Sequence, residues 1–425
     1  MKRKGFSHLP EPDGVNDNQA TPGRYSGGNG CTQALITGLT SLQGNMTGQC
    51  VDGSAGMWPG FIKLEIPDKG NRYLIVGGAA EEIFPLLNEK GVACSQGLRI
   101  TKQYPPPPPG KPEFISSAEM MRTCNNASEY VKMWSENYMR HGAPWGGRCN
   151  LVVDPTMGYC LEGANFVYGD PSNHTIHGPM YDQVFASANF YISKRLKVIA
   201  EAGIGAGYNR AKRLWELLID RQYDSTVMQP RLGGISLSYF MACLRDHGNV
   251  KPEDGRLSTY ISEERGDSAL CCHGLWEYTS NAFIGVARPD HTDLFSCEWM
   301  TSSQPCISPF LPIYIGVNKI PKALGTTEAY ELFEKLRAAV EYHPEYHEEI
   351  TRHWSVFEIQ AIEESFLLEN EAAPLVDKGK VTEAKELLTV FVQKKCDQSM
   401  ADCEKMLEFL SGLPILGKGA KEKLE

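Results

Sequence analysis

Cys31 is the residue whose position best suits nucleophilic chemistry. It follows the small-residue run GGNG at positions 27–30 and directly precedes residues 32–37 (TQALIT), where the sequence predicts a strand. Because glycine and asparagine let the backbone twist, the Cys31 thiol can attack the carbonyl carbon of Gly30. Cleavage between Gly30 and Cys31 would leave an α-amine with a pKa of about 8, suited to take the thiol proton. One residue would then serve as both nucleophile and base.

The composition excludes several classes of function. The chain has 425 residues, enough for one large or two medium domains, and its net charge of −10 disfavours nucleic acid or an anionic membrane as partner. No apolar run reaches the roughly 20 residues of a membrane span, and no apolar region follows the basic start. The thirteen cysteines are scattered, so we expect mostly reduced thiols in a cytoplasmic protein. The sequence lacks a Cys-x-x-Cys pair of the zinc-binding type.

The order of the expected elements indicates the fold class. Period-two alternation and turn residues predict hairpins that pair 61–66 with 72–76 and 149–154 with 159–163. Further strands are expected at 92–95, at 185–190 and between 269 and 298. Helices are expected at 81–87, from 117 to about 139 in two parts, around 208–222 and 236–246, and throughout the chain beyond about 326. Strands and helices alternating in this way predict an α+β fold with two antiparallel sheets packed between helix layers.

Several motifs, taken in order, resemble a known family. Gly30-Cys31-Thr32 followed by residues 48–52 (GQCVD) resembles the opening of the N-terminal-nucleophile (Ntn) cysteine hydrolases. The similarity is greatest to proteins of the acyl-coenzyme A:6-aminopenicillanate acyltransferase type and of the dipeptidase A/secernin type. Choloylglycine and penicillin V acylases are more distant. Further matches lie at 87–92, 150–162, 187–190, 244–247, 272–273 and 302–306. Together the motifs cover roughly residues 30–315.

The resemblance implies a domain organisation and an activity. Residues 1–30 would be a leader that self-cleavage removes, 31–325 a four-layer αββα Ntn-hydrolase sandwich, and 326–425 a helical extension. The enzyme would hydrolyse a small amide bond, or transfer its acyl group, through a thioester on Cys31. No metal or organic cofactor is implied. The partners would be a small amide or acyl substrate and further copies of the chain. The tail helix around 353–357 (HWSVF) is expected to anchor onto the core or onto another subunit.

The resemblance also assigns roles to individual residues. Asp52 would hold the new α-amine, and the side-chain N–H₂ of Asn189 would donate to the oxyanion. Gln49, Ser95 and Thr279 would contact the substrate. A structural interpretation stands beside each role, because Asp52 precedes a glycine as turn residues do and a buried asparagine needs partners in any case.

The chain departs from the family pattern at three places. Cys50 stands where the family has the asparagine of an Asn-x-Asp element, and Leu98-Arg99 stand where some relatives carry another asparagine. The second oxyanion donor would therefore be a backbone N–H or a side chain near residues 94–95. No arginine occurs at 277–281, where some relatives place one, and Thr279 or Ser280 would take its place.

Three alternatives remain open at this point. A dipeptidase would use the same fold and nucleophile. A catalytically inactive binding or scaffold protein would retain the fold alone. His247 and His273 suggest a Cys–His pair of the papain type, although a histidine with Arg and Asp neighbours is more often a structural hydrogen-bonding residue.

Overall fold

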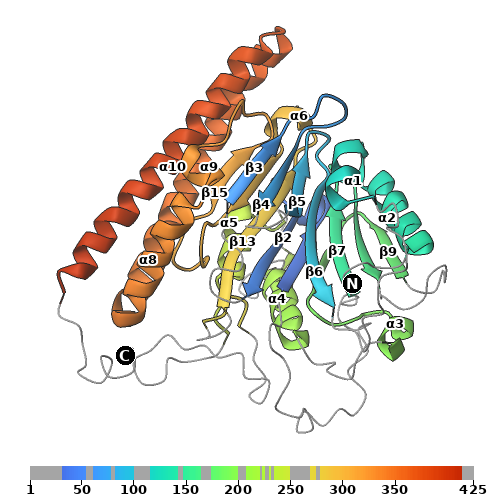
Figure 1. Cartoon of the computed structure of the whole chain (residues 1–425), viewed down its shortest axis with the longest axis horizontal. Helices are drawn as coiled ribbons and strands as arrows, with labels where there is room; N and C mark the ends of the chain where they lie inside the picture. Colours follow the sequence, from blue (N-terminus) through green and yellow to red (C-terminus); the bar gives the residue numbers. More distant parts are fainter. Residues whose placement is uncertain are drawn as a thin grey trace.

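The computed structural model describes residues 31–53, 61–77, 82–99, 115–141, 147–163, 174–199, 207–220, 223–224, 229–230, 234–248, 269–273 and 278–413. Within these ranges the chain is a mixed α+β protein with two large antiparallel sheets and a helical C-terminal region (Figure 1). The fold class expected from the sequence is confirmed at this level. The leader expected at residues 1–30 lies outside the described residues, so Cys31 is the one described residue of the expected cleavage site.

The first sheet contains Cys31 at the start of an inner strand. Its spatial order is β10-β1-β2-β13-β14-β15. The strands are β1 (Cys31–Ile36), β2 (Asn45–Gly53), β10 (Val184–Ser187), β13 (Tyr278–Ala287), β14 (Cys297–Met300) and β15 (Leu311–Tyr314). β1 and β2 form a hairpin in which Cys31 pairs with Val51. Because successive side chains of a strand point to opposite faces, Cys31 shares a face with Val51 and Gln49, whereas Asp52 lies on the other face.

The second sheet is a meander whose seven strands follow one another from β3 to β9. The strands are β3 (Phe61–Glu65), β4 (Tyr73–Gly77), β5 (Glu82–Asn88), β6 (Ala93–Arg99), β7 (Gly147–Val153), β8 (Gly158–Gly163) and β9 (His174–Met180). Both expected hairpins are present, as the β3–β4 and β7–β8 pairs. Each hairpin turns at a segment that contains Pro and Gly, and these turn residues made both hairpins predictable from the sequence.

The two sheets face each other across a layer of buried, hydrogen-bonded side chains. Ser95 of β6 donates to Oε1 of Gln33 on β1 over 3.1 Å and lies 2.9 Å from the hydroxyl of Thr47 on β2. Gln33 in turn donates to the carbonyl of Cys149 on β7 over 3.3 Å. Buried polar groups must find partners within the protein, so these bonds fix the position of one sheet against the other.

Helices cover the outer faces of the two sheets. α1 (Ser117–Thr123) and α2 (Ala127–His141) pack on the second sheet, and α4 (Tyr208–Asp220) and α5 (Leu237–Leu244) pack on the first. The short α3 (Lys194–Ile199) follows β10 in the chain. Tyr130 of α2 is buried in a hydrophobic cluster with Ile75 and Leu161 of the second sheet. On the first sheet, the Cys50 thiol donates to the carbonyl of Leu244 at the end of α5. Cys50 is on the same face of β2 as Asp52, so that face is turned towards helices.

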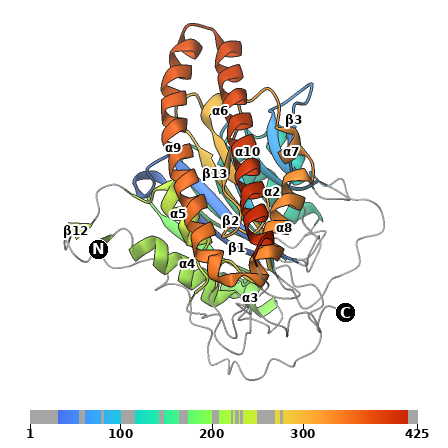
Figure 2. The ribbon, with the colours of Figure 1, turned by 90° about the vertical axis from the view of Figure 1, so that its left-hand side faces the viewer.

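The C-terminal region is helical, as expected. It comprises α7 (Lys322–Gly325), α8 (Glu328–Tyr342), α9 (His347–Asp377) and α10 (Val381–Ser411), after the short α6 (Thr292–Phe295). α9 and α10 are long antiparallel neighbours (Figure 2). Trp354 of α9 is fully buried and packs edge-on against Phe333 and Phe357. Trp354 also belongs to the same buried hydrophobic cluster as the strands of the first sheet, so it anchors the tail to the core of this chain. Among the described residues, no helix is both long and apolar enough to span a membrane.

Two parts of the sequence-based prediction differ from the structure. Residues 81–87 were expected to be helical, but β5 pairs with β4 over this region, and the register shifts on both sides of the Ile75–Pro85 and Val76–Phe84 pairs. Sheet pairing overrides the helix preference of the Glu-rich segment, and the irregular register accommodates a proline that cannot donate to the ladder. β9 and β15 were not expected, because neither has an alternating apolar pattern.

Candidate functional site

Cys31 is the first residue of β1, and its side chain is buried. Its backbone nitrogen donates to Oδ1 of Asn189 over 3.0 Å. The register of the two strands explains this contact. Gln33 pairs with Ser187 at the end of β10, so two further steps along each antiparallel chain bring Cys31 level with Asn189. The sheet itself thus places these two expected site residues together.

A buried arginine completes the surroundings of Asn189. Arg210 on the first turn of α4 donates through Nη2 to Oδ1 of Asn189 over 3.0 Å, and through Nη1 to Oδ2 of Asp52. Arginine and a peptide N–H are donors only, so the atom of Asn189 that meets both must be its oxygen. The amide therefore has a defined orientation, with its N–H₂ end directed away from Arg210 and from the Cys31 nitrogen.

The Arg210–Asp52 ion pair is withdrawn from solvent, with side-chain exposures of 6% and 0%. Burial on its own would lower the pKa of Arg210. The negative charge of Asp52 and the nearby Cys272 outweigh this effect, so the pKa of Arg210 is raised above its ordinary value. The guanidinium therefore stays charged, and it holds a full positive charge within hydrogen-bond distance of the amide that contacts Cys31.

Thr279 holds the second oxygen of Asp52. Its hydroxyl donates to Oδ1 of Asp52 over 2.7 Å and accepts from the backbone nitrogen of Cys272 over 2.8 Å. The two side chains meet because Thr279 of β13 pairs directly with Asp52 of β2, just before a register shift. Both carboxylate oxygens of Asp52 are therefore held, one by a cation and one by a hydroxyl.

Gln49 lies on the thiol side of the sheet. Its Nε2 is 4.0 Å from Sγ of Cys31, and its Oε1 accepts from the backbone nitrogen of Gln96 over 2.6 Å. The contact with β6 orients the Gln49 amide so that its N–H₂ end faces the sulfur. Gln49 therefore lies beside the thiol of Cys31. Asp52 lies on the opposite face of the sheet and is connected to the Cys31 nitrogen through Arg210 and Asn189.

Ser95 lies apart from this group. Its hydroxyl contacts Thr47 and Gln33 in the layer between the sheets. The nearby backbone nitrogen of Gln96, a candidate second oxyanion donor, already donates to Gln49. The structure therefore brings Cys31, Gln49, Asp52, Asn189 and Thr279 into one connected network, with Ser95 next to it.

Arg210 was missed from the sequence, although a signal was present. The buried face of α4 consists of apolar side chains that recur at helical spacing, and Arg210 lies one position before the first of them, Ala211. An arginine on the buried face of an amphipathic helix requires a buried anion, and Asp52 supplies it. Nothing in the sequence indicates this pairing, because the partners are 158 residues apart.

The histidines expected to suggest a papain-type pair have other neighbours. Nε2 of His273 lies 3.2 Å from the thiol of Cys306 and 3.7 Å from that of Cys271, and it lies 3.1 Å from Nε2 of His247. A cavity of about 280 Å³ lies between α9 and α10, and none of its lining residues belongs to the network around Cys31. All thirteen cysteines lie within the described ranges, and no disulfide joins any of them.

No protein-family model matches this sequence, and a comparison with curated proteins finds no significant match. Function therefore has to be argued from the chemistry of the site. The network offers a thiol, a nitrogen bonded to an oriented amide, and a buried ion pair next to that amide. A thiol beside an oriented amide suits nucleophilic attack on a carbonyl carbon, and the Cys31 nitrogen would be able to act as the base once it is a free α-amine.

Proposed function

We propose that this protein is an Ntn cysteine hydrolase, with the four-layer αββα sandwich of that class and with Cys31 as its nucleophile. Removal of residues 1–30 would turn the Cys31 peptide nitrogen into an α-amine at the same place. The observation that carries the proposal is the bond from this nitrogen to Oδ1 of Asn189. An α-amine there would be oriented by a group that is itself held by the Arg210–Asp52 pair.

The proposed reaction proceeds through a thioester. The α-amine of Cys31 takes the thiol proton, and the sulfur attacks the carbonyl carbon of the substrate amide. The N–H₂ end of Asn189 donates to the oxygen on which negative charge develops. The ammonium then returns the proton to the leaving amine as the C–N bond breaks. Water or a second amine attacks the thioester in the same manner, which gives hydrolysis or acyl transfer.

Arg210 has a further role in this proposal. A guanidinium close to the α-amine disfavours a second positive charge there, which lowers the pKa of the amine below its ordinary value of about 8. Asp52 partly offsets this effect and keeps Arg210 in place. The result is an amine that is unprotonated near neutral pH and can therefore act as a base.

The substrate class follows from the nucleophile rather than from any recognised pocket. A small, linear amide whose acyl carbon can reach Cys31 at the start of β1 fits the proposal. A dipeptidase acts on the same type of bond, and an inactive scaffold is the remaining alternative. The cytoplasmic location and the homo-oligomeric state expected from the sequence remain predictions.

The proposal is tested by trapping the thioester. The protein is mixed with a panel of N-acyl amino acids, dipeptides, β-lactams and conjugated amines, quenched in acid, and mapped by peptide mass spectrometry. We expect an acyl adduct on Cys31 with at least one compound and none in Cys31→Ala. Cys94→Ala, which removes a buried thiol of the second sheet, is the matched control and should retain the adduct. Turnover that persists in Cys31→Ala but is lost in Cys94→Ala would refute the proposed nucleophile.

A further inference from the structure

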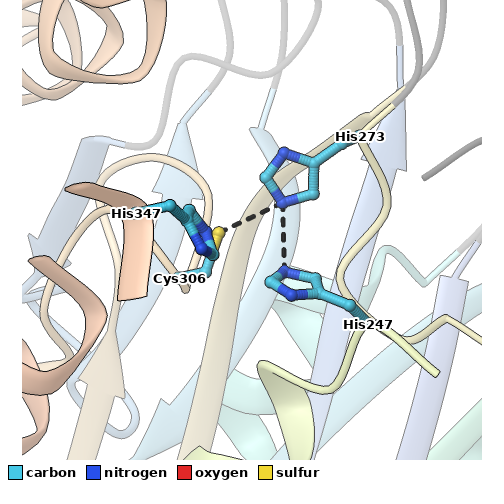
Figure 3. Close-up of side chains that lie close together, drawn as sticks. All are labelled: His247, His273, Cys306 and His347. Atoms are coloured by element: carbon cyan, nitrogen blue, oxygen red, sulfur yellow. Dashed lines mark hydrogen bonds between the residues drawn. The ribbon is translucent and has the colours of Figure 1, made fainter. Parts of the chain in front are cut away.

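Four side chains that are distant in sequence come together at one buried place. They are His247 just after α5, His273 in the segment 269–273, Cys306 between β14 and β15, and His347 at the first turn of α9 (Figure 3). Nε2 of His273 lies 3.1 Å from Nε2 of His247 and 3.2 Å from Sγ of Cys306. One potential ligand atom from each of the four lies within 4.8 Å of every other.

The polar atoms of this cluster are not satisfied by the protein alone. Nε2 of His347 is buried and has no hydrogen-bond partner among the described residues, and the residue is 8% exposed. A buried polar atom without a partner costs about 1–3 kcal/mol, so its retention requires an explanation. A metal ion bound at this nitrogen would supply the missing partner.

We propose that His247, His273, Cys306 and His347 bind one zinc ion. Three imidazole nitrogens and one thiolate form a tetrahedral set that Zn²⁺ favours. Zinc–nitrogen distances of about 2.0–2.1 Å place two ligand nitrogens of a tetrahedron roughly 3.3 Å apart, close to the separation of His247 and His273. On binding, Cys306 releases its thiol proton to solvent, and the ion takes the sulfur lone pair and one nitrogen lone pair from each ring.

Four protein ligands leave no open position, so the zinc ion would be structural. It would tie α9 of the C-terminal region to the turn after α5 and to the segment 269–273. That segment also reaches the network around Cys31, because the backbone nitrogen of Cys272 donates to Thr279, which donates to Asp52. The ion would therefore fix His273, which is the neighbour of Cys272. The Cys272 nitrogen in turn holds the Thr279 hydroxyl that contacts Asp52. The zinc site does not depend on the proposed hydrolase function.

The chief rival is a disulfide between Cys271 and Cys306, whose sulfurs are 3.6 Å apart. A disulfide would remove the thiolate ligand and leave His347 unsatisfied. The sequence gives no signal for either arrangement, because the three ligands His247, His273 and Cys306 are separated by 26 and 33 residues.

The test measures metal content and coordination in the full-length protein. We expect protein purified without chelators to hold about one zinc per chain, and Co²⁺ in its place to give the visible bands of a tetrahedral site with a thiolate ligand. His347→Gln and Cys306→Ser should each weaken zinc binding by at least about 100-fold, since loss of an outer-shell partner alone costs 10–100-fold. His353→Gln is the matched control, because His353 lies on the same helix with 43% of its side chain exposed.

The Co²⁺ spectrum of the unmodified protein keeps the test decisive even where a ligand variant fails to fold. Wild-type protein that takes up neither metal after incubation in reductant would overturn the proposal. So would a Co²⁺ spectrum that is unchanged in Cys306→Ser, or a Cys271–Cys306 disulfide found in metal-free wild-type protein by thiol counting.

Discussion

The backbone nitrogen of Cys31, the first residue of β1, is 3.0 Å from Oδ1 of Asn189, which lies two residues beyond the end of the neighbouring strand β10. This relationship gives Asn189 two separate tasks in the proposed mechanism. Its oxygen positions the nitrogen of the nucleophile, and its N–H₂ end donates to the oxyanion. The two tasks reside on different atoms of the same amide, so they can be separated by substitution.

Asn189→Asp retains an acceptor for the Cys31 nitrogen and for Arg210 but lacks the N–H₂ donor. We expect kcat to fall by roughly 10²–10³-fold with little change in KM, as for loss of one oxyanion donor. Asn189→Ala should lose as much in kcat and also lower the melting temperature, because Arg210 loses an acceptor. Steady-state kinetics and thermal melting on both variants decide between the roles. Wild-type kcat in Asn189→Asp would rule out oxyanion donation and leave a positioning role.

The Arg210–Asp52 pair is expected to be strongly coupled. Arg210→Met leaves the Asp52 carboxylate buried without its cation, which should lower the free energy of unfolding by about 3–5 kcal/mol. The double variant Arg210→Met/Asp52→Asn should regain part of this loss, because no buried charge remains. Arg213→Met, one turn further along α4, removes a partly exposed pair with Asp246 and should cost less than about 1 kcal/mol. Denaturant unfolding of wild type, Arg210→Met, Asp52→Asn and the double variant gives the coupling energy. Additive effects of the two single substitutions would contradict the expected coupling.

The same arginine should control the pH dependence of turnover. Without the Arg210 charge, the α-amine of Cys31 holds its proton more tightly, so its pKa rises. The acidic limb of kcat/KM should therefore move to higher pH in Arg210→Met, provided the variant folds. A pH–rate profile of the folded variant measures this shift. A limb that stays in place would show that the α-amine is not the base or that Arg210 does not act on it.

Glu298 makes stability depend on pH in an independent way. It lies on β14, and both of its carboxylate oxygens are buried without hydrogen-bond partners among the described residues. Burial raises its pKa well above the ordinary value, so the folded protein holds a proton that the unfolded chain releases above about pH 4.3. Its contribution to stability is complete below that pH and is lost as pH rises towards the folded-state pKa. The slope approaches about 1.4 kcal/mol per pH unit.

Glu298→Gln should remove this slope. Denaturant unfolding of wild type and variant at a series of pH values gives the difference directly, and other titrating groups cancel in it. We expect the variant to gain on the wild type steadily as pH rises above about 4.3. A difference that does not change with pH would mean that Glu298 is ionised in the folded protein.

Most of the fold could be predicted from patterns within short stretches of sequence. Contacts between residues that are distant in sequence could not. The hairpins at 61–77 and 147–163 have their turn residues and alternation within one short window, so they could be predicted. β5 could not, because its pairing with β4 outweighs the helix preference of its own residues. Cys31, Asp52 and Asn189 were identified through ordered motifs. Arg210 was not identified, because it meets its partner Asp52 only when α4 packs on the sheet.

The intact mass of the purified protein, with N-terminal sequencing, tests the central claim most directly. If Cys31 is an N-terminal nucleophile, wild-type protein should lack residues 1–30 and begin at Cys31. Cys31→Ala should retain those residues, have no activity and keep its circular dichroism spectrum, because one thiol performs both cleavage and turnover. Wild-type protein that turns over substrate at its full rate with residues 1–30 still attached would contradict the account.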